Sequence, residues 1–146
     1  MASLQQNLSI VVPAYNEEDG LAEFHRRTAA VLNELPMNSE IVYVNDGSRD
    51  LTLDIMKSLQ TNDLRVVIVD LSRNYGKEIA LTAGFDHARG DAIVWIDADL
   101  QDPPEMISDL IDEWHEGYNV VSARRISRRG ETWFKKATAC TETVLT

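Results

Sequence analysis

Cysteine and long apolar runs are scarce in this sequence. The single cysteine, Cys140, excludes an internal disulfide, and no apolar run approaches the roughly 20 residues that a membrane-spanning helix requires. Residues 1–7 form a polar N-terminal tail that lacks the basic and apolar segments of a signal peptide. These absences favour a soluble or peripheral chain on the cytoplasmic side.

Two glycine-rich phosphate-binding motifs are also absent. The sequence contains neither G-x-G-x-x-G nor G-x-x-x-x-G-K-S/T. These patterns form the phosphate cradles of dinucleotide-binding proteins and of P-loop proteins. Any nucleotide that this chain binds must therefore be held by other groups.

Acids outnumber basic residues in this sequence, but one segment has a net positive charge. There are 14 lysines and arginines against 24 acids, a net charge of −10 that argues against a general nucleic-acid binder. Residues 124–136, the basic segment, hold six lysines or arginines and one acid, a net +5 that leaves −15 for the remainder. Clustered arginines serve either as a solvated face or as a phosphate-binding site.

The composition predicts one α/β domain spanning residues 1–146. It is 44% hydrophobic and 26% charged, which is ordinary for a globular protein with a sizeable core. Strand patterns at residues 8–12, 41–44, 65–71, 92–96 and 119–123 alternate with amphipathic helical patterns. The economical architecture is a mostly parallel sheet with helices on both faces.

Several residues are expected to mark the ends of these elements. Pro13 should stop the first strand because it cannot donate to a ladder, and Asn16 is a candidate cap for the helix that follows. Asp102 should cap the fourth helix, with Pro103 in its first position and Glu105 closing a capping box.

The apolar residues of these elements are the expected core. The inward face of the second helix should consist of Leu51, Ile55 and Leu59, and further core candidates are Met56, Met106 and Trp95. The three histidines have no partner at metal-ligand spacing, so structural or solvent-facing roles are expected for His25, His87 and His115.

Carboxylates are concentrated after the fourth expected strand, in I-V-W-I-D-A-D-L-Q-D-P-P-E. Residues i and i+2 of a strand project to the same side, so Asp97 and Asp99 could bind one ligand, with Gln101 as a further oxygen donor. Mg²⁺ is typically held by one or two carboxylates together with substrate phosphates. The alternative is a set of solvated acids that serve only the turn and the helix cap.

The predicted parallel sheet brings other polar residues to the same edge, where such sheets bind ligands. Tyr15 could stack on a base, and Glu17 and Asp46 could accept hydrogen bonds from base or ribose groups. Each of them alone also suits a turn. Lys77, at a helix start, is unfavourable for the helix dipole and could instead contact a phosphate.

Five motifs resemble, in the same order, the N-terminal half of family 2 glycosyltransferases with the GT-A fold. They are V-V-P-A-Y-N-E-E, V-N-D-G-S-R-D, S-R-N-Y-G-K-E-I-A-L-T-A-G, W-I-D-A-D-L-Q-D-P-P-E and A-R-R-I-S-R-R-G-E-T-W-F-K-K, and they cover roughly residues 8–136. The sequence is most similar to the polyprenyl-phosphate type, the bactoprenol glucosyltransferases and dolichyl-phosphate mannosyltransferases. The resemblance implies a Rossmann-like, three-layer GT-A sandwich.

The resemblance also implies a set of site residues. Those implied to bind the nucleotide sugar are Pro13, Tyr15, Glu17, Asp46, Lys77 and Asp97. Asp97 and Asp99 would be catalytic, holding Mg²⁺ or Mn²⁺ on the diphosphate together with Gln101. Arg125 and Arg128 would meet the phosphate of the lipid acceptor.

The reaction implied by the resemblance is an inverting, metal-dependent transfer of a hexose, with glucose from UDP-glucose favoured, to a polyprenyl phosphate at the membrane surface. The metal would neutralise the charge that builds on the departing nucleoside diphosphate. The acceptor phosphate is already ionised near neutral pH, so a dedicated general base would be unnecessary.

The sequence departs from the family pattern at three places. Asn45 replaces the first aspartate of D-D-G-S, and Ala123 stands where a glycine is usual. After Lys136 the chain continues only as A-T-A-C-T-E-T-V-L-T. The family pattern continues there with further acceptor-site residues, amphipathic helices and usually membrane spans. The resemblance thus implies a C-terminally incomplete domain, with residues 124–146 as its acceptor-side segment and atypical tail. It would be a truncated gene product, a product with a frameshifted tail or a domain fragment, and the intact protein would be associated with the inner membrane.

Two other hypotheses stay open at this point. The chain could be an inactive remnant that acts as a nucleotide-binding or self-associating module, with an oligomer as the result. It could also be a soluble family 2 transferase with a sugar acceptor, although that reaction would need a base-supplying acid and the basic segment favours a phosphate. The sugar, the base and the lipid are left open.

Overall fold

The computed structural model describes residues 5–117, 120–125 and 133–138. A parallel four-stranded sheet has the order β3-β2-β1-β4, formed by β1 (Asn7–Ala14), β2 (Asn38–Asn45), β3 (Val66–Asp70) and β4 (Ala92–Trp95). The helices that alternate with these strands are α1 (Leu21–Glu34), α2 (Thr52–Asn62), α3 (Lys77–His87) and α4 (Met106–His115). The predicted α/β class with a mostly parallel sheet is confirmed.

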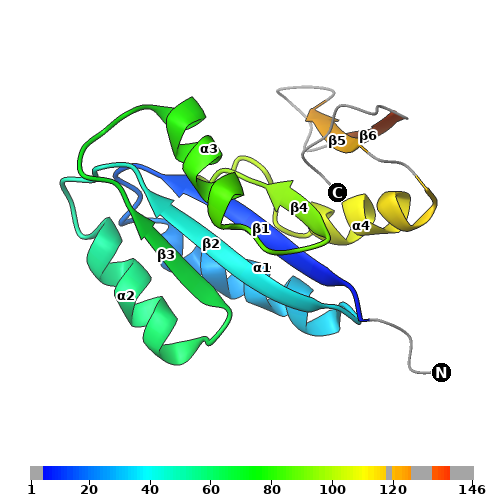
Figure 1. The fold of residues 1–146 in the computed structure, drawn as a ribbon, viewed down its shortest axis with the longest axis horizontal. Helices are drawn as coiled ribbons and strands as arrows, with labels where there is room; N and C mark the ends of the chain where they lie inside the picture. The colour runs from blue at the N-terminus through cyan, green and yellow to red at the C-terminus, as the bar shows by residue number, and fades with distance from the viewer. Residues whose placement is uncertain (1–4, 118–119, 126–132, 139–146) are drawn as a thin grey trace.

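Helices cover both faces of the sheet, which gives three layers (Figure 1). α1, α2 and α4 pack on one face in a cluster that includes Phe24, Met56 and Ile107. α3 packs on the other face, against Val11 and Val44. At Gly84 this helix approaches so closely that an added Cβ would lie 2.4 Å from Val11 Cγ1. None of the helices in the described ranges is long and apolar enough to cross a bilayer.

The fifth strand expected at residues 119–123 is present, but it lies outside the parallel sheet. β5 (Val120–Arg125) pairs antiparallel with β6 (Trp133–Thr138) in a separate two-stranded sheet, with Val121 opposite Ala137. Within the described residues it has no place in the four-stranded sheet. β6 lies mostly in the basic segment, where no strand was expected. Neighbouring chain segments pair antiparallel through a short connection, whereas parallel pairing requires a long crossover.

β1 continues through Pro13, where the sequence predicted its end. Ala14 O accepts a hydrogen bond from Asp46 N (3.0 Å) on the β2 side, and Val11 O accepts one from Ile96 N (3.0 Å) on the β4 side. Alternate residues of a strand form hydrogen bonds to opposite neighbours, so the backbone of Pro13 faces the β4 side. The pairing of β1 with β4 ends before it, at Val11 and Trp95. The N–H that proline lacks therefore has no ladder position to fill.

The first two helices start later than expected because the loops after β1 and β2 bind each other. Asn16 does not cap α1: it has φ 52°, and its Oδ1 accepts a hydrogen bond from Arg49 N (2.9 Å). α2 begins only at Thr52, so Leu51 precedes the helix and is 59% exposed rather than inward-facing. Thr52 is fully buried in its place, and Met56 is buried as predicted.

α4 begins at Met106 rather than at Pro103, and no side chain caps it at Glu105. The Glu105 carboxylate instead forms a bidentate pair with Arg27 of α1, with Nε–Oε1 2.9 Å and Nη2–Oε2 2.6 Å. Arg27 holds the pKa of Glu105 below its usual value. Ile107 is fully buried in the core, and Met106, a predicted core residue, is partly buried and packs against it.

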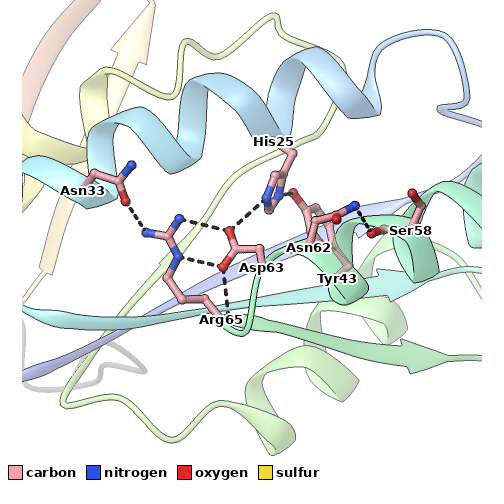
Figure 2. A network of polar contacts seen from close by, with 7 residues as sticks. All are labelled: His25, Asn33, Tyr43, Ser58, Asn62, Asp63 and Arg65. Atoms are coloured by element: carbon pink, nitrogen blue, oxygen red, sulfur yellow. Dashed lines mark hydrogen bonds and ion pairs between the residues drawn. The ribbon is translucent and has the colours of Figure 1, made fainter.

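A polar network ties α1 to β2 and to the loop before β3 (Figure 2). His25, 7% exposed, contacts Tyr43 Oη through Nδ1 (2.7 Å) and Asp63 Oδ2 through Nε2 (3.0 Å). Arg65 donates to both Asp63 oxygens, at 2.9 and 3.0 Å, and to Asn33 Oδ1 at 3.0 Å. Burial lowers the pKa of His25, and its neutral ring satisfies both neighbours. His25 thus has the structural role expected from the sequence.

Replacing Asp63 with alanine is expected to lower the free energy of unfolding at pH 7 by about 2 kcal/mol, because His25 Nε2 and Arg65 lose their acceptor. Hydrogen bonds from Arg65 lower the pKa of Asp63 from 3.8 to about 2. The stabilisation is therefore complete above about pH 4 and is lost as the pH falls to about 2. Urea unfolding of wild type and Asp63→Ala at pH 7 and at pH 2.5 measures this, and a pH-independent difference would contradict it. Asp63→Asn, which keeps an acceptor without the charge, is the control.

Candidate functional site

A pocket of about 240 Å³ lies at the carboxyl edge of the parallel sheet. It is formed by the ends of β1 and β2, the first residue of α3 and the turn after β4. The lining residues are Pro13, Ala14, Tyr15, Glu17, Asp46, Lys77, Asp97, Ala98 and Asp99. The six residues predicted to bind a nucleotide sugar therefore lie together, as does the second predicted metal ligand.

The other predicted site residues lie elsewhere. Gln101 does not line the pocket; its backbone N–H donates to Asp99 Oδ1 at 3.0 Å. Arg125 is the last residue of β5. Arg128 lies outside the described residues.

Asp97 and Asp99 lie on a turn rather than on a strand, because β4 ends at Trp95. Ala98 between them is buried, and Leu100 has φ 64°, a left-handed conformation that is rare for leucine. This tight turn brings the Gln101 N–H to the Asp99 carboxylate and puts both carboxylates on the pocket. The two carboxylates of the D-A-D sequence converge on one pocket, as expected, but they do so because of a turn and not because of strand alternation.

Lys77 carries the positive charge of the pocket. Its Nζ lies 2.7 Å from Asp97 Oδ2 and 5.2 Å from the centroid of the Trp95 ring. Trp95, a core candidate from the sequence, is 45% exposed because β4 is the edge strand of the four-stranded sheet. Lysine over an indole face is a favourable cation–π geometry, so Trp95 supports the lysine beside the carboxylate.

Asp46 is 4% exposed and connects two loops. Its Oδ1 accepts a hydrogen bond from Tyr75 N (2.8 Å), and its Oδ2 accepts from Gly76 N (3.1 Å). The Asn74 side-chain amide donates to the Asp46 carbonyl at 3.1 Å. We call this set of contacts the Asp46 clamp. It fixes the segment that immediately precedes Lys77.

Asn45, which departs from the family pattern, has a structural partner. Its Nδ2 donates to Asp70 Oδ1 of β3 at 2.9 Å, and its Oδ1 accepts from Ser48 N at 3.1 Å. An aspartate in this buried position would place a second carboxylate against Asp70. An amide is therefore the side chain that fits between an acid and a backbone donor.

The potential in the pocket is negative. Glu17 has its pKa raised by burial and then by the charges of Asp99, Asp97 and Asp50. Its backbone N–H donates to Thr52 Oγ1 at 2.9 Å, which fixes the loop that carries it. A diphosphate would be repelled by these carboxylates unless a cation lay between them.

The donor set fits a divalent cation in part. Asp97 and Asp99 supply the hard carboxylate oxygens that Mg²⁺ and Mn²⁺ prefer. Among the described residues there is no group of three or more histidine, cysteine or acidic side chains arranged to hold a metal. Two carboxylates suit a cation whose remaining ligands are phosphate oxygens and water.

The fold and the pocket define an α/β protein with an acidic site at the carboxyl edge of its sheet, and comparison with known proteins identifies its family. The family model for glycosyl transferase family 2 matches residues 9–142, so the chain belongs to glycosyltransferase family 2. An uncharacterised glycosyltransferase of Synechocystis is 54% identical over 132 residues, covering 90% of this chain and 42% of the relative. The bactoprenol glucosyl transferase of Shigella phage SfV is 44% identical, with 90% and 43% coverage. The chain thus spans about two fifths of the length of these relatives.

The fold is that of GT-A glycosyltransferases. S. aureus TarS 1–349 in complex with UDP-GlcNAc superposes with a TM-score of 0.65 and 26% sequence identity, covering 79% of this chain and 33% of TarS. The GT-A fold predicted from the five motifs is therefore confirmed, as is the transferase family.

Proposed function

We propose that this chain, residues 1–146, is the donor-binding domain of an enzyme that transfers a hexose from a nucleotide sugar to a polyprenyl phosphate. The observation that carries the proposal is the single pocket that unites Pro13, Tyr15, Glu17, Asp46, Lys77, Asp97 and Asp99. UDP-glucose is the favoured donor, supported by the bactoprenol glucosyl transferase relatives and by TarS with UDP-GlcNAc. The bactoprenol glucosyl transferase relative also supports a membrane-associated intact enzyme, which we place at the cytoplasmic side of the inner membrane.

In this proposal different pocket residues bind different parts of the nucleotide sugar. Tyr15 stacks on the base, and Glu17 and Asp46 face the nucleoside. Asp97 and Asp99 would hold Mg²⁺ or Mn²⁺ on the diphosphate, and Lys77 would contact the phosphates. When bound, the metal neutralises the charge that builds on the departing nucleoside diphosphate.

The acceptor side of the proposal depends on the basic segment. Arg125 and Arg128 bind the lipid phosphate, because the guanidinium fork matches phosphate oxygens. That phosphate attacks the anomeric carbon with inversion, the sugar bond to the diphosphate breaks, and no protein base is needed since the nucleophile is already an anion.

Calorimetric titration of this chain with UDP, with and without Mn²⁺, tests the proposal. UDP is expected to bind with Mn²⁺ and to bind at least about tenfold more weakly without it, because the carboxylates repel the diphosphate. GDP and CDP are the controls for the base, and UDP-glucose and UDP-GlcNAc compare the sugar. Absence of UDP binding at millimolar concentrations with Mn²⁺ present would reject the proposal.

A further inference from the structure

The ion pair between Lys77 and Asp97 occupies the position where the proposed function requires a metal ion. Lys77 Nζ lies 2.7 Å from Asp97 Oδ2, one of the oxygens that a divalent cation would take. The two side chains are 51% and 29% exposed, so the pair is at the pocket surface and can open without unfolding. Two cations cannot share that oxygen at contact distance without strong repulsion.

The backbone holds this lysine in place. Lys77 is the first residue of α3, and the preceding Gly76 donates its N–H to Asp46 Oδ2. The Asp46 clamp therefore fixes where the lysine side chain starts, and Trp95 supports its ammonium group. The ion pair is a consequence of the fold around the pocket rather than of two mobile surface chains.

We propose that Lys77 is an internal counter-cation: it neutralises Asp97 in the ligand-free pocket and moves to the diphosphate when a divalent cation takes the carboxylate. This inference rests on the proposed function. It makes Lys77 a ligand-binding residue that couples the binding of the metal to the binding of the nucleotide. Metal alone must displace the ammonium without compensation, whereas metal with a nucleotide offers the ammonium new phosphate oxygens. The two ligands consequently bind with positive cooperativity.

The test uses Lys77→Met, which removes the charge and retains an apolar stem against Trp95, and Lys77→Arg, which retains the charge. Mn²⁺ binding is measured by electron paramagnetic resonance with and without saturating UDP. Without UDP, Lys77→Met is expected to bind Mn²⁺ about three- to tenfold more tightly than wild type, because it lacks the competing cation. Lys77→Arg should stay within about twofold of wild type.

For UDP binding the substitution is expected to have the opposite effect. Lys77→Met should bind UDP in Mn²⁺ more weakly than wild type, so the factor by which UDP strengthens Mn²⁺ binding falls by about tenfold or more. Equal or weaker Mn²⁺ binding by Lys77→Met in the absence of UDP, or undetectable binding by that variant, would overturn the inference. Wild-type protein that binds UDP with Mn²⁺ would in that case leave the proposed function standing, so the two failures are distinguishable.

Discussion

Asp99→Ala is expected to weaken UDP binding in the presence of Mn²⁺ by on the order of 100-fold, to the affinity seen without metal. The metal site proposed in this pocket has two carboxylates, and a metal left with one of them would depend almost entirely on the diphosphate. Asp99 is exposed, and among the described residues its hydrogen bond is a local one, accepted from Gln101 N, so the variant should fold normally. Calorimetry with and without Mn²⁺ gives the affinity, and urea unfolding checks the fold.

The matched control is Asp86→Ala. Asp86 is an exposed acid on α3 that does not line the pocket, so the net charge changes equally while the site stays intact. UDP binding should stay within about twofold of wild type, since a distant surface charge is screened. Asp99→Ala with unchanged affinity would remove Asp99 from the metal site.

Gly47→Ala is expected to lower the free energy of unfolding by about 2 to 4 kcal/mol, combining left-handed backbone strain with a steric clash. Gly47 has φ 67°, and an added Cβ would lie 2.3 Å from Arg73 C and from Asn74 N. These are backbone atoms and cannot move aside as a flexible side chain can. The clash would push the Asn74–Gly76 segment away from Asp46, so UDP affinity should fall together with stability.

The variant Gly117→Ala separates the effect of backbone strain from that of the steric clash. Gly117 also has a positive φ, 106°, but an added Cβ would have no atom of the described residues within 4 Å. Strain alone should cost it about 1 to 2 kcal/mol, with UDP affinity unchanged. Urea unfolding and UDP titration of both variants make the comparison. Equal losses of stability and of UDP affinity in the two would show that the contact between the loops is unimportant.

Local pattern predicted most of the fold because the four strands of the parallel sheet are buried runs of isoleucine and valine. The errors came from contacts between distant segments. Arg49 binds Asn16, and Arg27 binds Glu105, and each contact replaces an expected cap. Leu51 was placed on a helix that begins one residue later. Spacing along the sequence does not reveal such pairings.

The residues of the pocket were predictable for a different reason. A parallel sheet brings the carboxyl ends of its strands to one edge, so Tyr15, Asp46 and Asp97 had to converge once the topology was known. What the sequence did not reveal is the Asp46 clamp. Asn74 and Gly76 had a local signal as turn residues, but their bonds reach back about 30 positions to Asp46. The position of Lys77 depends on those bonds.

The Asp46 clamp has a consequence for the entropy of ligand binding. Ordering one residue of a flexible loop costs roughly 1 to 2 kcal/mol of backbone conformational entropy. Asp46 already accepts hydrogen bonds from the backbone amides of Tyr75 and Gly76. The entropy cost of ordering these residues therefore arises when the chain folds and not when the nucleotide binds. The segment before Lys77 is thus hydrogen-bonded in place before any donor arrives, and the proposed movement at this side of the pocket is that of the Lys77 side chain.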